Sequence, residues 1–274
     1  MKKTLLFVAL IAVGCAEPIP RNLDDLSMQG PQYLDPETLD PYSGPAFRMS
    51  EDDPTQIVLR VNLRDGRFHG DFEDFELAGD SLGIYQTGTY RDGQKEGRTE
   101  FFYPSGVLYA RASYENDEAE GTSETYYETG QLQEKGIYLM GELDGPFENY
   151  YENGQLEATG TYVAGELDGL AESYHENGEP RNRINYVAGE LDGPYESYHE
   201  NGQLWGKYNY VAGEYDGPSE AYHEDGQLQQ KGVWNMGEAC GEWIVEGEVQ
   251  QRTPCPPGLS EALLEVSRSQ RSRY

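Results

Sequence analysis

The sequence predicts an all-β fold, an elongated single-layer array of β-hairpins with a 24-residue period. Turn glycines recur at a constant spacing, and a short fixed period is typical of stacked units that contact mainly their neighbours. Each unit has aromatic and β-branched residues interrupted by turn residues, which indicates a hairpin. Only 36% of residues are hydrophobic, which leaves little material for a second layer. The glycines are Gly106, Gly130, Gly154, Gly178, Gly202 and Gly226.

The N-terminal residues 1–14 have the pattern of an export signal. Two lysines precede an uncharged run, residues 5–13, that is too short to span a bilayer. The ending Ala12–Cys15 resembles the lipobox of bacterial lipoproteins, which implies cleavage before Cys15 and a lipid on its sulfur. A secreted protein with an incidental cysteine is the alternative. Residues 15–45 contain six prolines, so we expect the lipidated cysteine to be followed by an extended tether.

Residues 46–246 form the predicted array of hairpins. Its start is irregular, because the glycine pairs of residues 66–70 and 93–97 lie 27 residues apart instead of 24. Atypical units are expected where a stack of repeats stops. Aromatic ladders between neighbouring strands are the expected source of cohesion, and two strands per unit give a rise of about 10 Å per repeat.

The turn glycines predict three-residue loops. A two-residue primed turn needs positive φ at both central positions, which suits β-branched Thr129 poorly. A type I turn closed by a left-handed glycine, such as Gly202, accommodates every unit. This loop places Tyr198 opposite Leu204, and simple alternation of side chains places Tyr210 on the same face.

The C-terminal residues 247–274 are predicted to be a cap followed by a basic tail. Once Cys15 carries a lipid, Cys240 and Cys255 remain, and two cysteines in an exported chain indicate a disulfide. Cys240 stands where earlier units have aspartate, so the substitution in the last unit suits a capping role. We expect fraying disorder in this tail, with a two-turn helix over residues 260–266 as the alternative.

The repeat carries a family resemblance. Its motif Tyr-x-x-Gly-x-x-x-Gly, as in Tyr162–Gly169, is followed by aromatic-x-x-x-Gly-x-Leu. Both resemble the bacterial variant of the MORN repeat over about residues 62–246, and exported chains of this kind are grouped with the YwqK-family antitoxins. The resemblance implies a sheet of hairpins, neutralisation of a partner, and contacts with proteins or membranes. Asp117, where glycine is expected, and residues 181–184, where a neutral strand is usual, depart from the pattern.

The charge and the polar columns exclude several functions. A net charge of −30 at pH 7 repels nucleic acid and anionic lipid. It is first of all typical of a solvated surface that keeps the protein soluble, and it also suits basic proteins, polyamines or calcium as partners. His175, His199 and His223 recur too far apart to share zinc, so exposed sheet positions are expected. Acid columns, such as that of Glu166, do not converge on one calcium ion. With no catalytic triad or phosphate loop, we expect no enzymatic activity, metal or cofactor.

The candidate partner-binding residues are two rows on one face. Rings flanked by carboxylates suit a basic polypeptide, and they also suit sugar hydroxyls. A glycan or cell-wall binding module is therefore the alternative function, whereas a glycosidase needs a distinct acid and base. The sequence predicts a non-enzymatic protein-binding lipoprotein of antitoxin or scaffold type, anchored at the bacterial outer membrane. The rows are Glu148, Glu172 and Glu196, and Tyr150, Tyr174 and Tyr198.

Overall fold

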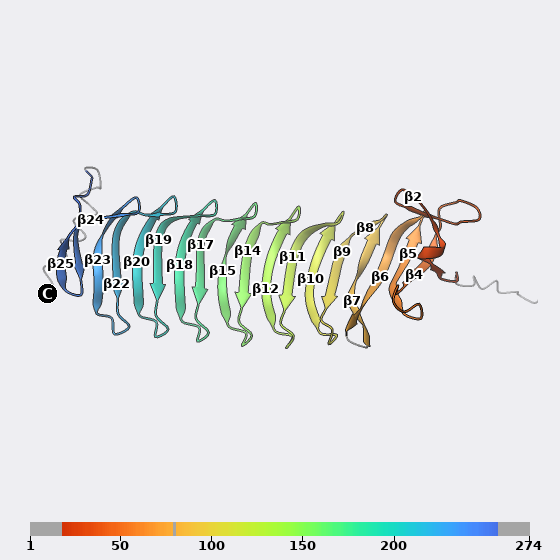
Figure 1. Cartoon of the computed structure of the whole chain (residues 1–274), viewed down its shortest axis with the longest axis horizontal. Helices are drawn as coiled ribbons and strands as arrows, with labels where there is room; N and C mark the ends of the chain where they lie inside the picture. Colours follow the sequence, from red (N-terminus) through yellow and green to blue (C-terminus); the bar gives the residue numbers. More distant parts are fainter. Residues whose placement is uncertain (1–17, 79–80, 257–274) are drawn as a thin grey trace, which may run out of the picture.

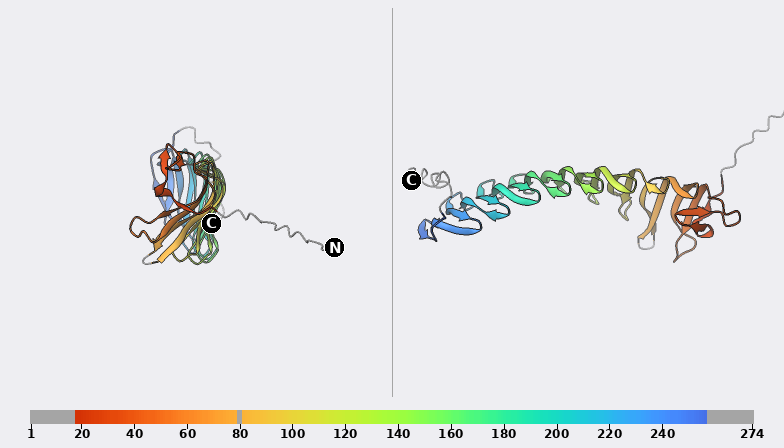
Figure 2. Two further views of the ribbon diagram at one scale, coloured as in Figure 1. Left: turned by 90° about the vertical axis from the view of Figure 1, so that its right-hand side faces the viewer. Right: turned by 90° about the horizontal axis from the view of Figure 1, so that it is seen from above.

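The computed structural model describes residues 18–78 and 81–256 and shows one long open sheet of hairpins stacked along a single axis (Figure 1). This sheet contains 23 strands, with its first and last hairpins at opposite ends of the molecule. Seen from above, it is a thin layer that bows along its length (Figure 2). The predicted single-layer array of β-hairpins is confirmed. The predicted signal peptide, Cys15 and the C-terminal helix lie outside the described residues.

Each strand of the sheet pairs antiparallel with its neighbour, except that β1 (Arg21–Asn22) runs parallel to β4 (Gly44–Met49). The irregular first part continues with β5 (Ile57–Arg64), β6 (Arg67–Ala78), β7 (Ser81–Arg91), β8 (Gln94–Lys95) and β9 (Gly97–Phe102). The regular part comprises β10 (Leu108–Glu115), β11 (Glu118–Tyr126), β12 (Leu132–Leu139), β13 (Glu142–Leu143), β14 (Gly145–Tyr150), β15 (Leu156–Val163), β16 (Glu166–Leu167), β17 (Gly169–Tyr174), β18 (Pro180–Val187), β19 (Glu190–Tyr198), β20 (Leu204–Val211), β21 (Glu214–Tyr215), β22 (Gly217–Tyr222), β23 (Leu228–Asn235), β24 (Glu238–Val245) and β25 (Glu248–Gln251).

One edge of the sheet, which we call the loop edge, consists of the predicted three-residue loops. In one of them the N–H of His199 donates to the carbonyl of Gln203 at 2.8 Å, and the N–H of Gly202 donates to the carbonyl of His199 at 2.9 Å. Gly202 has φ of 78°, whereas Thr129, which precedes the glycine of an earlier loop, does not have positive φ. The prediction that only the glycine takes the left-handed conformation is therefore confirmed.

A β-bulge next to each loop changes which side chains share a face. Tyr198 pairs with Leu204 as predicted, but Ser197 pairs with Gly206, so one residue of β20 is left over. Beyond this bulge the alternation is reversed, and Tyr210 lies on the face opposite to Tyr198. The prediction that the two rings share a face is wrong, because simple alternation ignores the extra residue.

The opposite edge, which we call the turn edge, consists of two-residue turns. Ala188 and Gly189 have φ of 48° and 78° between the paired residues Val187 and Glu190, which is the primed geometry that matches the strand twist. Asp117, which stands where the pattern has glycine, adopts φ of 71° and keeps the turn. The residues before the glycine in the other regular turns are Met140, Ala164, Ala212 and Met236.

In the regular part of the sheet, aromatic rings packed on one face, which we call the aromatic face, serve the role of a buried hydrophobic core. The Tyr195 ring lies 5.8 Å from Tyr210 between centroids, and Tyr215 stacks on Trp234 at 5.2 Å. Burial raises the pKa of Tyr195 and Tyr210, since their neutral hydroxyls are favoured among these rings. Gly160 leaves room for the Phe147 ring, because a Cβ there would lie 2.8 Å from it. Rings on neighbouring strands thus hold successive units together, as predicted.

A folded cap covers the N-terminal end of the sheet. Residues 18–45 contain the 3₁₀ turn η1 (Leu23–Asp25) and the hairpin of β2 (Ser27–Gln29) and β3 (Gln32–Leu34). The predicted extended tether does not describe these residues, because apolar side chains between the prolines cover an otherwise open sheet end. The buried cluster is Leu23, Leu26, Ala46, Val61, Leu63 and Phe72.

Two further irregularities mark the ends of the array. The three extra residues of the irregular first part lengthen β6 and β7 to 12 and 11 residues. At the other end, Cys240 and Cys255 form a disulfide bond, and Cys240 is buried. Because β24 and β25 follow the last loop, the bridge fastens the chain beyond the array to its terminal hairpin.

Candidate functional site

A row of alternating charges, which we call the charge ladder, crosses the second face of the sheet, the charged face. Neighbouring strands pair an acid with a base at one level, and a threonine replaces the base twice. Opposite charges on paired strands stabilise a sheet by roughly 0.2–1 kcal/mol per pair. The ladder consists of Arg60, Glu73, Thr87, Glu100, Arg111, Glu124, Lys135, Glu148, Thr159, Glu172, Arg183, Glu196, Lys207, Glu220 and Lys231.

The predicted glutamates and tyrosines lie together on this face, where they contact each other. The Tyr198 hydroxyl donates to Glu196 Oε2 at 2.8 Å, while Lys207 Nζ lies 3.2 Å from Glu196 Oε1. The hydrogen bond from Tyr198 is the main cause that holds the pKa of Glu196 below its usual value. Glu172 has the same arrangement, with Arg183 Nε at 2.7 Å from its Oε1. Both carboxylates are therefore already neutralised within the sheet.

Glu148 differs from the other predicted glutamates. It accepts a hydrogen bond from the Tyr150 hydroxyl at 2.8 Å, but it forms no ion pair with any described residue. Its strand neighbour on one side is Thr159, at a position where the next three units have Arg183, Lys207 and Lys231. Its strand neighbour on the other side is Lys135, so of the three predicted glutamates Glu148 alone has a basic strand neighbour but no close ion pair with a described residue.

The aspartate column on the turn edge has a structural role that the sequence reasoning missed. Asp168 Oδ2 accepts from the N–H of Ala188 at 3.2 Å, and Asp144 does the same for Ala164 of its following unit. Each aspartate thus caps the turn of the next unit. The sequence did contain a signal for this role, because each aspartate lies 20 residues before a turn residue other than glycine that has positive φ. Cys240 occupies this column in the last unit.

The glutamates of the turn edge form an exposed row, which we call the acidic rim. They lie in the first strand position after each turn, paired with the last residue before it. None of them forms an ion pair with another described residue. This rim, unlike the charge ladder, presents negative charge that the described part of the chain leaves uncompensated. Its members are Glu142, Glu166, Glu190 and Glu214.

The tyrosine and histidine column of the loop edge also joins successive units. The Tyr151 hydroxyl donates to the carbonyl of Tyr174 at 2.7 Å, and His175 Nε2 lies 3.0 Å from the carbonyl of Tyr198. Since a carbonyl only accepts, this histidine nitrogen carries the proton. The expected exposed position is wrong: His175, like His199, is half-buried. Within the described ranges, no three potential ligands lie close enough to hold a metal ion.

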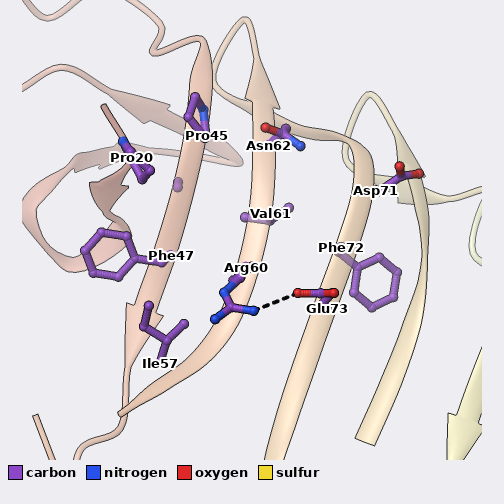
Figure 3. A pocket seen from close by; sticks show the side chains of 11 residues that line it. Pro20, Pro45, Phe47, Ile57, Arg60, Val61, Asn62, Asp71, Phe72 and Glu73 are labelled. Carbon is purple, nitrogen blue, oxygen red and sulfur yellow. Dashed lines mark hydrogen bonds and ion pairs between the residues drawn. The ribbon is translucent and has the colours of Figure 1, made fainter. Parts of the chain in front are cut away.

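A hollow lies near the N-terminal cap, in the irregular part of the sheet (Figure 3). It has a volume of about 320 Å³, and Phe47, Ile57 and Val61 line it. Two of its three charged side chains neutralise each other, because Arg60 Nη1 lies 3.0 Å from Glu73 Oε2, and the third is Asp71. Because Arg60 and Glu73 form this ion pair, neither side chain is a free base or acid in the hollow.

Comparison with known proteins identifies the repeat. A family model described as the MORN repeat variant matches residues 95–116, 119–139, 143–164, 167–188, 191–212 and 215–235. No curated protein sequence matches the chain. Among the described residues, no helix is both long and apolar enough to cross a membrane. The predicted MORN repeats are thus confirmed.

Several solved structures show partial likeness. A GtfA/B complex bound to UDP and GlcNAc is 14% identical over 49% of this chain and 24% of its own, with a TM-score of 0.18. The TcdB2-TccC3-Cdc42 complex is 11% identical over 75% of this chain and 14% of its own, with a TM-score of 0.22. A porin-like protein from Bacteroides uniformis is 12% identical over 74% of this chain and 90% of its own, with a TM-score of 0.19. This chain spans about a quarter or less of the first two, and TM-scores this low carry no conclusion.

Proposed function

We propose that this chain, a protein with six variant MORN repeats, is a non-enzymatic scaffold that binds a basic protein along its sheet. The observation that carries the proposal is the division of the acids into two sets. Those of the charge ladder are largely paired within the sheet, whereas the acidic rim has no ion pair with any described residue. A partner with a complementary positive surface would be steered toward this rim.

Export and anchoring are part of the proposal. Residues 1–14 are a signal peptide, and lipidated Cys15 holds the array at the outer membrane of the bacterial envelope. In this setting the finer role is immunity, with the array neutralising a basic toxin that acts in the envelope. Labelling with a palmitate analogue should mark the wild type and miss Cys15→Ser. Equal labelling of both proteins would contradict the lipid anchor.

The structure favours a protein partner over the glycan alternative. The hydroxyl of Tyr150 donates to Glu148, and the same bond joins Tyr198 to Glu196. The polar atoms that would recognise sugar hydroxyls are therefore engaged with each other. Among the predicted binding residues, Glu148 is the best placed to receive a partner's lysine or arginine, because Glu172 and Glu196 already form close ion pairs, whereas Glu148 forms none with a described residue.

A pull-down from the native cells tests the proposal. The wild-type protein is compared with a rim variant, in which Glu142, Glu166 and Glu190 are replaced by Gln, and with the predicted set Glu148, Glu172 and Glu196 replaced by Gln. A basic protein should co-purify with the wild type, and the rim variant should bind it more slowly and with a flatter salt dependence. The second set should mainly lower stability. If no basic protein is retained, or if rim neutralisation leaves binding unchanged at low and high salt, the proposal is wrong.

A further inference from the structure

An exposed aliphatic strip lies on the charged face at the turn edge, where its members alternate along the array with the glutamates of the acidic rim. Its main members occupy the last strand position before the turn in four successive units. Their exposed fractions are high for aliphatic side chains, and Ile137 and Leu170, at 36% and 51%, widen the strip toward the ladder. The main members are Leu139 at 44%, Val163 at 52%, Val187 at 52% and Val211 at 38% exposed.

The strip has defined ends. The same position holds Glu115 in the preceding unit and Asn235 in the following one. The flanking units form the same hairpins without an aliphatic residue at this position. Strand formation therefore does not explain why four neighbouring units have one. Exposed aliphatic side chains that gather in one part of a surface, here interleaved with acids, are typical of an interaction site.

We propose that this strip binds a basic amphipathic α-helix of the partner, lying along the axis of the array; this rests on the proposed function. Two strands advance by about 9.6 Å per unit, and seven residues of an α-helix advance by about 10.5 Å. An apolar side chain at every seventh helix position therefore meets one strip residue per unit. Over the three steps from Leu139 to Val211 the mismatch reaches only about 3 Å, which side-chain rotamers absorb.

The charges beside the strip select a basic helix. Each of Val163, Val187 and Val211 is paired with a rim glutamate across its turn, so lysines or arginines flanking the apolar helix positions reach the rim. On the ladder side, Glu148 lies between the strands of Leu139 and Val163, opposite Lys135 on one strand and uncharged Thr159 on the other. An anionic membrane or a second copy of this chain would bring like charges against the rim. An amphipathic helix that presents apolar and basic side chains on one face meets both requirements with one element.

The probe for a direct test is a synthetic helix of about three heptads, with leucine at the facing position and lysine beside it. Its fluorescence anisotropy is measured with the mature protein and with a strip variant carrying Leu139→Thr, Val163→Thr and Val187→Thr. Threonine keeps the strand propensity, and circular dichroism verifies the fold. We expect the Kd to rise about tenfold or more in the strip variant. A probe in which glutamate replaces lysine should not bind.

A matched charge control separates the rim from the overall charge. Replacing Glu142, Glu166 and Glu190 by Gln removes three charges at the strip, and replacing Glu152, Glu176 and Glu200 by Gln removes three at the loop edge. The first set should weaken binding of the probe at least about fivefold more than the second. Equal effects of the two sets, no binding of the probe, or equal affinity of the strip variant would each overturn the inference.

The same strip variant distinguishes this inference from the proposed function. Native-cell pull-downs are performed with wild type and strip variant in parallel. A basic partner that co-purifies equally with both leaves the scaffold function intact and overturns the strip as its docking site. Absence of any basic partner from both overturns the scaffold function. Loss of the partner from the strip variant alone, together with weakened probe binding, supports the inference.

Discussion

The indole ring of Trp243 packs over Gly232. We therefore expect that adding one methyl group at position 232 lowers the stability of the fold. A Cβ at Gly232 would lie 2.1 Å from Trp243 Cδ2 and 2.2 Å from Cε2, far inside van der Waals contact. The ring cannot easily move, because its N–H donates to the carbonyl of Cys240 at 3.1 Å and its edge contacts Trp234 at a centroid distance of 5.2 Å. Trp243 is only 4% exposed, so displacement would also expose apolar surface.

The magnitude follows from two opposing contributions. Overpacking of this kind costs about 1–3 kcal/mol, while replacing a strand glycine by alanine returns roughly 0.5–1 kcal/mol of backbone entropy. We therefore expect Gly232→Ala to lower the free energy of unfolding by about 1–2 kcal/mol. The matched control is Gly136→Ala in the same column, where the nearest atom is the terminal Cδ2 of Leu143 at 2.9 Å. This methyl group can rotate away, so the control should be near neutral.

Urea unfolding followed by tryptophan fluorescence measures both variants. Two of the three tryptophans, Trp234 and Trp243, lie beside the mutated glycine, so the signal reports on this end of the array. Since repeat arrays can open from one end, circular dichroism of the whole sheet is recorded in parallel. Equal midpoints for Gly232→Ala and Gly136→Ala would show that packing of the Trp243 ring does not require the absence of a side chain at position 232.

Three further predictions concern turns and pH. Asp168→Ala removes the hydrogen bond to the N–H of Ala188 and should lower the free energy of unfolding in urea by about 1 kcal/mol, whereas Asp168→Asn keeps an acceptor and should recover most of it; equal loss in both would contradict the capping role. Gly202→Val should lower the free energy of unfolding by about 1–2 kcal/mol, because Gly202 has φ of 78°. Thr129→Gly should not raise the free energy of unfolding, and a clear increase in the same urea titration would contradict the loop geometry. Burial raises the pKa of Tyr210 in the folded protein. The contribution of this group to the free energy of unfolding is fully present below the unfolded pKa of about 10, and it is lost as the pH rises further. The urea midpoint should therefore fall above about pH 10, and a constant midpoint there would count against burial of the phenol.

The repeat unit and its loop were predictable because their signals are local. The period follows from the turn glycines, and Thr129 alone excludes a turn with positive φ at its position. The β-bulge was not predictable in this way. The residue left over next to each loop differs in chemical character between units, as Glu157, Arg181 and Trp205 show. Because backbone pairing rather than side-chain type sets the bulge, composition gives no sign of the reversed face.

The candidate site was predictable in part for a related reason. The rows of Glu172 and Tyr174 follow from the period, but their mutual hydrogen bond and the ion pair with Arg183 depend on which strands meet across the sheet. Once the register is known, the acids divide into paired and unpaired sets. The N-terminal cap was missed because prolines dominate the composition of residues 18–45, whereas a few leucines, such as Leu23, decide their packing.

The hydrogen bonds between units all span fixed distances along the chain. The loop-edge bond from Tyr151 or His175 reaches a carbonyl 23 residues ahead, and the bond from Asp168 reaches an N–H 20 residues ahead. Duplication or loss of one whole 24-residue unit therefore recreates every such bond, whereas an insertion of any other length breaks both sets. Recombination within the gene can thus lengthen or shorten the array in steps of about 10 Å with its junctions unchanged, so the reach of the protein can evolve separately from its stability.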